Sequence, residues 1–306
     1  MRDAFVTALT EIARVDKNVM LLTGDLVFGV LTEFAHEFPK QYVNVGVAEQ
    51  NMTGLATGMA LEGKTVFTYS ICNFPTFRCL EQIRNDACYH NADVKIVSIG
   101  GGFCYGPLGM SHHATEDLAV MRAIPNLTVV APGDTVETML TTRAICEHKG
   151  PCYLRLGRGG EPKIYDQVPE FVLGKGINVV KGGDISILSI GGILSNVMSA
   201  HEILKKKGIG TSVFSMHTLR PIDRRLIENL AEESRLIVTV EEHSISGGLG
   251  GAVAEILAEI RGNRAPLLRI GIDGDFCCEV GDQEYLRKLY GLDREAIAER
   301  VEKAIA

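Results

Sequence analysis

The chain has 306 residues, of which 46% are hydrophobic and 23% are charged, and this length and balance are typical of a globular protein with two domains. Its formal net charge of −7 provides no basic surface for nucleic acid, and no apolar run is long enough to cross a membrane. The eight cysteines are scattered without CxxC or metal-ligand spacing, which indicates reduced thiols in a cytoplasmic protein.

The first half of the chain alternates between helix-like and strand-like hydrophobic patterns. One face of a predicted amino-terminal helix carries Phe5, Val6, Leu9, Ile12 and Ala13. Short apolar runs predict buried strands at 19–22, 66–69, 94–99, 127–131 and 152–156. Helices are expected at 52–60, 77–90 and 134–148. Strands that alternate with helices imply a mostly parallel sheet with helices on both faces.

A second α/β run follows an irregular stretch at 157–176 that is rich in Gly, Pro and charge, as is typical of a linker. We therefore expect one α/β domain at 1–160, a linker at 161–176 and a second α/β domain at 177–306. In the second domain the pattern predicts strands at 185–190, 211–216, 236–241 and 266–272. Its helices are expected at 195–207, 223–232, 249–261 and behind Asp293, a favourable N-cap residue.

Residues with unusual chemistry follow the predicted strands of the first domain. They lie in the segments TGD (23–25), YSICNFPTFR (69–78), GGGFCYGPLGMSHH (100–113) and RGG (158–160). Ligands of open α/β sheets bind beyond the carboxyl ends of the strands. We therefore expect the functional site at this edge of the first domain.

Glu49 stands at the start of a predicted helix within GVAEQN (46–51), and the small residues Gly54 and Gly58 follow it. Small residues allow a ligand or another helix to approach closely. Two interpretations are open from the residues alone. The carboxylate could exchange protons within a site, or it could simply occupy the first turn of a helix, where negative charge is stabilising.

Several ordered motifs together resemble the family of transketolases and 1-deoxyxylulose-5-phosphate synthases. They are GVAEQN, YS-x(3)-F-x(2)-FR-x(3)-QIRN, GP-x(3)-SHH-x(2)-EDL and IPNLTVVAP. A later run, TVEEHSISGGLGGAVAE (239–255), is similar to the C-terminal domain of that family. The resemblance covers essentially the whole chain. It implies a pyrimidine-binding domain of the thiamine diphosphate-binding fold, followed by a transketolase C-terminal-like domain.

The resemblance gives Glu49 a specific role. In the family, the matching glutamate hydrogen-bonds N1′ of the aminopyrimidine ring of thiamine diphosphate. It thereby promotes the imino tautomer, whose nitrogen removes the proton from C2 of the thiazolium. The cofactor then serves as an electron sink. The proton relay requires a carboxylic acid, so glutamine would be a poor substitute.

An aromatic residue in the second motif stacks on the aminopyrimidine in the family. In this chain the turn is shifted, so that the usual aromatic position falls near Pro75. Phe74 is favoured over Phe77 for this role, and the alternative is that one or both belong to the core. The expected cofactor contacts also include Tyr69 and Asp25, although a plain turn role for Asp25 is equally open.

His112 and His113 form a pair after a glycine-rich loop, and two histidines on a predicted site loop suggest chemistry more than a lone one does. By resemblance, His112 faces the substrate, where it donates to an oxygen or transfers a proton. His113 supports it from behind while also bordering the substrate. The family usually has an aspartate directly before the Gly-Pro of this loop, where this chain has Tyr105. This departure leaves the preferred stereochemistry of the substrate open.

Two arginines match positions that hold substrate phosphate in the family. Arg158 follows the predicted strand CYLRL, and Arg2 begins the first helix. A guanidinium group suits two-point recognition of a phosphate. A solvated surface role is the alternative for both. Arg155 is expected on the opposite side of its strand.

The family holds the diphosphate through Mg²⁺, which is bound by a GDG-containing segment in a preceding domain. We find no such segment in the expected context in this sequence. The resemblance therefore implies that the Mg²⁺ and diphosphate ligands come from a separate N-terminal subunit, and that this chain supplies no metal ligand. It also implies a homodimer core that gives an α2β2 heterotetramer, with Gly54, Gly58 and GGLGG (247–251) as candidates for close subunit packing.

The leading hypothesis is thus the C-terminal (beta) subunit of a transketolase, with the ketol-transfer chemistry of EC 2.2.1. Such an enzyme moves a two-carbon unit between sugar phosphates, as in pentose phosphate metabolism. The alternatives are the beta subunit of a 2-oxo acid dehydrogenase and a non-catalytic scaffold. The SHH-x(2)-EDL motif and Arg158 favour the sugar enzymes, while an intact Glu49 and His112 argue against a scaffold. The sequence leaves the donor and acceptor sugars open.

Overall fold

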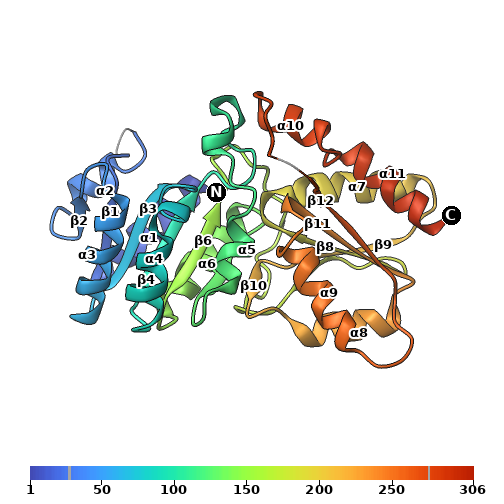
Figure 1. The fold of residues 1–306 in the computed structure, drawn as a ribbon, viewed down its shortest axis with the longest axis horizontal. Helices are drawn as coiled ribbons and strands as arrows, with labels where there is room; N and C mark the ends of the chain where they lie inside the picture. The colour runs from blue at the N-terminus through green and yellow to red at the C-terminus, as the bar shows by residue number, and fades with distance from the viewer. Residues whose placement is uncertain (27–28, 275) are drawn as a thin grey trace.

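The computed structural model describes residues 1–26, 29–274 and 276–306. It contains two mostly parallel sheets that lie beside each other, each with helices on its faces (Figure 1). This arrangement is the predicted α/β architecture of two domains.

The first sheet has the strand order β10-β5-β6-β4-β3-β1-β2, and only the pairing of β10 with β5 is antiparallel. Its strands are β1 Val19–Thr23, β2 Tyr42–Asn44, β3 Thr65–Ile71, β4 Val94–Ile99, β5 Thr128–Val130, β6 Cys152–Leu156 and β10 Thr218–Arg220. The runs at 94–99 and 152–156 confirm the predicted strands, and every residue in them is buried. Parallel strands covered on both faces require such continuous burial.

The helices of the first half cover both faces of this sheet. They are α1 Arg2–Val15, α2 Thr32–Glu37, α3 Glu49–Leu61, α4 Leu80–Gln82, α5 Asp117–Ala123 and α6 Thr135–Glu147. Helices α1 and α6 bury their apolar residues in one core cluster, and α3 and α5 contribute to another on the opposite face. The helix predicted at 77–90 is divided into the 3₁₀ turn η1 Phe77–Cys79, α4 and the π-helical segment η2 Ile83–Cys88.

The second sheet has the order β12-β11-β8-β9-β7, with β7 antiparallel to β9. Its strands are β7 Ile177–Val180, β8 Ile185–Ile190, β9 Thr211–Ser215, β11 Leu236–Ser244 and β12 Leu267–Ile272. Its helices are α7 Leu194–Lys206, α8 Arg224–Glu233, α9 Leu249–Glu259, α10 Gln283–Leu289 and α11 Arg294–Ile305. As predicted, Asp293 caps α11, and its side chain accepts a hydrogen bond from the amide of Ala296.

The two halves of the chain contribute to one common sheet and one common core cluster. Strand β10 comes from the second half of the sequence but completes the first sheet at its β5 edge. One core cluster is continuous between the halves and joins residues such as Leu22 and Met52 to Leu188 and Ile237. The sequence pattern did not predict β10, because an edge strand of three residues leaves no periodicity to detect.

The glycine run 247–251 packs against its own chain. The carboxylate of Glu241 accepts hydrogen bonds from the amides of Leu249 and Gly250 at 2.7 and 2.8 Å, at the start of α9. A Cβ at Gly248 would lie 2.0 Å from a carboxylate oxygen of Glu241. Both Gly248 and Gly250 are buried. Gly248 and Gly250 therefore serve close packing within the chain and are not available for contact with another subunit.

The sequence also predicts that no segment crosses a membrane and that the cysteines are reduced. Within the described ranges, no helix has the length and apolar character that would let it cross a bilayer. All eight cysteines are free thiols.

The linker is held partly through His217. Its fully buried ring stacks on Phe171 of the linker at a centroid distance of 4.2 Å, and Nδ1 pairs with the hydroxyl of Thr218 at 2.9 Å. Burial lowers the pKa of His217 from 6.5 to about 4. Because the unfolded chain then binds the proton more readily, the contribution of His217 to the free energy of unfolding is fully present above pH 6.5 and is lost as the pH falls toward 4.

We expect His217→Gln to reduce this pH-dependent decrease by up to about 3 kcal/mol, the value that the lowered pKa implies. Urea unfolding at a series of pH values measures it. The exposed His36→Gln is the matched control and should keep the wild-type slope. Parallel pH profiles for His217→Gln and the wild type would contradict the assignment.

Candidate active site

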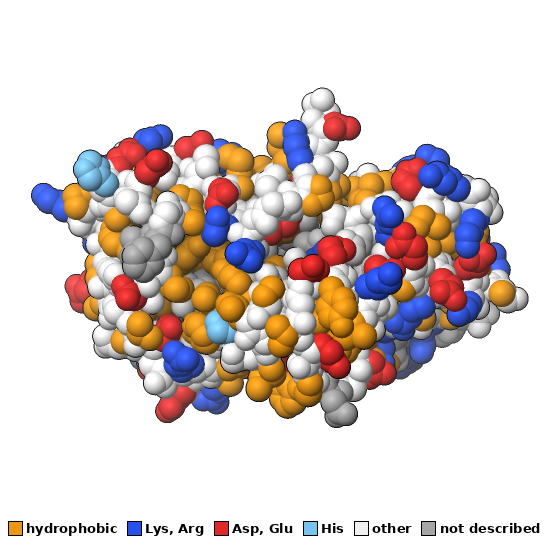
Figure 2. Space-filling view, turned by 90° about the horizontal axis from the view of Figure 1, so that it is seen from above, with side chains coloured by type: hydrophobic (Ala, Val, Ile, Leu, Met, Phe, Trp, Pro, Cys, Tyr) orange, Lys and Arg blue, Asp and Glu red, His pale blue; other side chains and the backbone are white. Residues whose placement is uncertain are grey.

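The predicted site residues gather at the carboxyl edge of the first sheet. The segments that follow β1, β3, β4 and β6 meet there, because these strands are neighbours and run in the same direction. Figure 2 looks onto the corresponding face of the molecule, where hydrophobic side chains gather around a hollow.

Glu49 is the first residue of α3 and is only 3% exposed. Its Oε2 accepts a hydrogen bond from Nη1 of Arg78 at 2.8 Å. Its Oε1 accepts no hydrogen bond from the residues that the structure describes. A Cβ at Gly24 would lie 3.5 Å from Cγ of Glu49, so the TGD turn lies directly against this carboxylate. Glu49 therefore presents one fixed oxygen and one free oxygen.

Phe74 and Arg78 connect Glu49 to the histidine loop. The guanidinium carbon of Arg78 lies 4.8 Å from the centre of the Phe74 ring, a cation–π contact. The same ring meets His112 edge-on at 5.3 Å. In the sequence, Arg78 stands out only as part of a motif. Its pairing with Glu49 was missed because residues 29 positions apart give no periodic signal.

His112 lies on the turn η4 Met110–His112, next to the pocket. Its Nδ1 pairs with the hydroxyl of Ser111 at 3.0 Å, which leaves Nε2 unbonded among the described residues. Partial burial, with a smaller effect of His113, lowers the pKa of His112. The ring is therefore neutral at pH 7 and can accept or donate a proton at Nε2.

His113 is largely buried and is one of the residues that line the pocket. It is 4% exposed, and its Nε2 pairs with the carbonyl of Gly106 at 3.3 Å. The side chain of Asn73 donates to the carbonyls of Ser111 and His113 at 3.1 and 2.7 Å. The turn that carries Phe74 and the loop that carries His112 are thus tied together. Asn73 is a further site residue that the sequence analysis did not single out.

A cavity of about 360 Å³ lies beside these groups and includes residues of both halves of the chain. It is lined by Asn73, Phe74, Phe77, Arg78, Met110, Ser111, His113, Thr115, Glu116, Phe276 and Cys277. We call it the aromatic pocket. Neither phenylalanine belongs to a core cluster, since Phe74 is half-buried and Phe77 is 37% exposed. The alternative of a core role for one or both of them is therefore wrong.

Tyr69, Arg2 and Arg158 lie at a second point on the same edge. The guanidinium carbon of Arg158 lies 5.5 Å from the centre of the Tyr105 ring. Burial raises the pKa of Tyr105, whereas the nearby charges of Arg158 and Arg2 lower it. Tyr69 is buried and stacks on Phe5 at 6.1 Å. Tyr69 therefore lies close to Arg2 and Tyr105.

Tyr105 connects this group with the histidine. Its ring lies 6.3 Å from that of His112. It occupies the position where the family pattern has an aspartate, so the departure brings an aromatic side chain between the histidine and the two arginines. Asp25 lies at the other end of the site, where its backbone has a φ of 61° and it exchanges hydrogen bonds with Asn44 at 3.1 and 3.0 Å. Those bonds give Asp25 a turn role.

Arg155 is directed into the interior of the protein. It is 5% exposed, and its Nε donates to Asp117 at 2.9 Å. The hydroxyl of Tyr153 donates to the same carboxylate oxygen at 2.6 Å. This buried network lies behind the histidine loop. No pattern in the sequence indicates it, because its members stand on separate elements.

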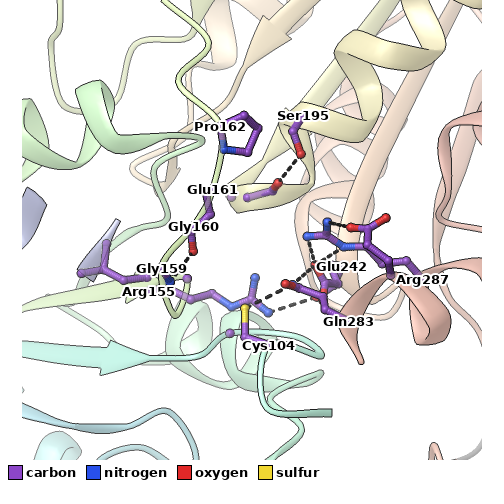
Figure 3. A pocket seen from close by; sticks show the side chains of 16 residues that line it. Cys104, Arg155, Gly159, Gly160, Glu161, Pro162, Ser195, Glu242, Gln283 and Arg287 are labelled. Carbon is purple, nitrogen blue, oxygen red and sulfur yellow. Dashed lines mark hydrogen bonds and ion pairs between the residues drawn. The ribbon is translucent and has the colours of Figure 1, made fainter. Parts of the chain in front are cut away.

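A smaller cavity of about 160 Å³ lies between the two domains. Figure 3 shows Arg155, Glu242, Gln283 and Arg287 converging on it from both domains. Arg287 binds the carboxylate of Glu242 through Nε at 2.9 Å and Nη2 at 2.6 Å.

Comparison with known proteins assigns the family. The model of the transketolase pyrimidine binding domain matches residues 1–162, and that of the transketolase C-terminal domain matches residues 174–297. The chain belongs to the transketolase family. The family and the two-domain architecture are those that the sequence resemblance implied.

Relatives within the transketolase family match the full length of the chain. A putative transketolase C-terminal section from Methanocaldococcus jannaschii is 43% identical over 304 residues, which cover 98% of this chain and 95% of that protein. A subunit of the apulose-4-phosphate transketolase from Phocaeicola vulgatus is 38% identical, with 97% and 94% covered. A solved split gene transketolase, described as an inactive beta4 tetramer, superposes with a TM-score of 0.88 at 35% identity, with 99% and 97% covered.

Proposed function

We propose that this chain is the C-terminal subunit of a thiamine diphosphate-dependent transketolase, which transfers a two-carbon ketol unit from a ketose to an aldose together with a diphosphate-binding partner. The observation that carries the proposal is the buried Glu49, held by Arg78 beside the aromatic pocket. The names of the similar proteins support a subunit of this type. They favour it over a 2-oxo acid dehydrogenase subunit.

The residues present fit the aminopyrimidine half of the cofactor. Glu49 offers one oxygen without a hydrogen bond from the described residues, and Phe74 offers a half-buried aromatic face close to it. A cavity of about 360 Å³ is within the usual size of a ligand site. When bound, the cofactor supplies the carbanion-stabilising chemistry of the reaction.

Each of the site residues has a defined task in this proposal. Glu49 would share a proton with the ring nitrogen of the pyrimidine through the oxygen that no described residue hydrogen-bonds, while Arg78 fixes the other oxygen. Phe74 stacks on the ring. His112, oriented through Ser111, presents Nε2 to an oxygen of the substrate and transfers a proton to or from it.

The arginine group provides a place for a substrate phosphate. Arg158 and Arg2 border Tyr105, and Tyr105 borders His112. A sugar that reaches His112 with its carbonyl end could therefore place a terminal phosphate against the arginines. One similar protein has a sugar phosphate in its name, which supports a phosphorylated substrate here.

A partner subunit is expected to complete the site. Among the described residues, no three His, Cys, Asp or Glu side chains are arranged to hold a metal ion. The rim of the aromatic pocket is apolar and exposed, with Phe77 at 37%, Met110 at 55% and Phe276 at 68% exposure. Exposed apolar patches of this kind mark interaction surfaces. We assign the Mg²⁺ and diphosphate ligands to the partner that covers this rim.

Helix α3 supplies a candidate surface for the homodimer core. Leu55 and Leu61 on α3 are exposed at 40% and 58%, and Val47, just before the helix, is exposed at 76%. A Cβ at Gly54 or Gly58 would meet no described atom within 4 Å outside the adjacent residues and the backbone of α3 itself, so another backbone can approach there. Two copies packed through α3, each recruiting one partner, give the proposed α2β2 assembly.

We expect Glu49→Gln to lower the turnover of the reconstituted enzyme by about 100-fold or more, because glutamine cannot exchange the proton. Thermal unfolding should change little, since the shape is kept and Arg78 is 47% exposed to solvent. The matched control is Glu62→Gln at the exposed end of the same helix, which should keep full turnover. Wild-type activity of Glu49→Gln would refute the proposal.

Arg158→Ala should raise KM for a phosphorylated ketose by about tenfold or more, because a charge-assisted hydrogen bond is lost. The KM for the unphosphorylated analogue should change much less. Lys163→Ala, which removes an exposed cation from the nearby linker, is the control. Equal effects of Arg158→Ala on both substrates would show that Arg158 binds no phosphate.

A further inference from the structure

The histidine loop of the first domain is held from the second domain. The amide of Phe103 donates to Oε1 of Glu242, at the end of β11, at 2.7 Å. The Phe103 ring is fully buried and belongs to the core cluster of the second domain, where it lies 5.3 Å from Tyr290. The loop therefore takes both its polar and its apolar support from across the domain boundary.

Hydrogen bonds from its own domain hold the side chain of Glu242 in place. It is 3% exposed, and both of its oxygens accept hydrogen bonds from Nε2 of Gln283, at 2.9 and 3.0 Å. Arg287, 5% exposed, binds Oε2 through two nitrogens. Separating a buried charge pair leaves an uncompensated charge and is strongly destabilising, so Glu242 and Arg287 stay together. Figure 3 shows this group from close by.

The glycines of the loop make room for this contact. A Cβ at Gly102, whose φ is +65°, would lie 2.6 Å from the Glu242 carboxylate. A Cβ at Gly106 would lie 2.3 Å from the carbonyl oxygen of Gly281 and 2.6 Å from Leu286. The glycine-rich segment thus serves close approach to the second domain.

A short series of contacts connects the Glu242–Phe103 contact to the two histidines. Gly102 and Ala114 exchange two backbone hydrogen bonds at 2.8 and 3.0 Å, which close the loop. The Phe103 ring meets His113 edge-on at 5.3 Å. His113 in turn pairs with the carbonyl of Gly106. A shift of Phe103 therefore moves the turn that carries His112.

We propose that Glu242 is a positioning residue for His112, so that the second domain sets the geometry of the histidine loop in the first. The effect of Glu242 on turnover rests on the proposed function, whereas its effect on the geometry of the histidine loop does not. Loss of the Glu242 charge leaves the buried Arg287 with only the exposed Glu284 as a counter-ion and loosens the amide of Phe103.

The test compares Glu242→Gln with Lys95→Met. Lys95 is also buried and paired, with Asp93, but it lies near the opposite end of β4. Hydrogen exchange followed by mass spectrometry should show faster exchange of residues 100–113 in Glu242→Gln only. In the reconstituted enzyme kcat should fall by about 10- to 100-fold, as expected for a misplaced catalytic group, with a much smaller change in KM.

A double variant, Glu242→Gln with Arg287→Gln, removes the unpaired charge and covers the case in which the single variant does not fold. It should regain stability while the loop still exchanges fast. An unchanged rate of hydrogen exchange of residues 100–113 in Glu242→Gln would overturn the proposal. An equal increase of that rate in Lys95→Met would also overturn it. Full turnover of His112→Asn would refute the role of that histidine in the proposed function, and the exchange result would still decide the positioning role of Glu242.

Discussion

Buried charges at the boundary between the two sheets are the constraint on which the rest of the structure depends. Arg155 on β6 donates to Asp117 and to the backbone carbonyl of Glu242 on β11, at 2.9 and 3.0 Å. Glu242 is neutralised by Arg287. An unpaired charge at such depth costs several kcal/mol, so these partners must stay together. The two domains therefore behave as one body at this point.

The positions of the histidine loop and of the aromatic pocket depend on this boundary. The histidine loop lies between the sheets and cannot move freely from either, while the aromatic pocket takes Phe276 and Cys277 from the second half of the chain. On the outer side nothing in the described chain covers the pocket rim. The free oxygen of Glu49 and the exposed aromatic residues therefore form one wall of a site whose opposite wall is proposed to come from another polypeptide.

Much of the fold could be predicted because its signals are local. The strands at 94–99, 152–156 and 185–190 are continuous apolar runs, and Asp293 is a cap next to its own helix. The gathering of Glu49 and His112 at one edge followed from the parallel order of the strands. Local patterns and sheet topology were sufficient for these features.

The remaining features depend on partners that are distant in the sequence. Pairing of Arg78 with Glu49 spans 29 residues, and that of Glu242 with Phe103 spans 139. The π-helical segment η2 has the apolar spacing of an ordinary helix. The glycines around 102 and 248 are candidates for a site or an interface on their sequence alone, yet a Cβ at either would collide with a glutamate of the same chain. Only the folded chain reveals which group each glycine faces.

The central claim is that this chain forms one wall of a thiamine diphosphate site and needs a second polypeptide for the other. Calorimetric titration of thiamine diphosphate with Mg²⁺ tests it most directly, into the purified chain and into its complex with a diphosphate-binding transketolase subunit. We expect tight binding and ketol transfer for the complex and neither for the chain alone. Equal affinity and full turnover from the chain by itself would contradict it.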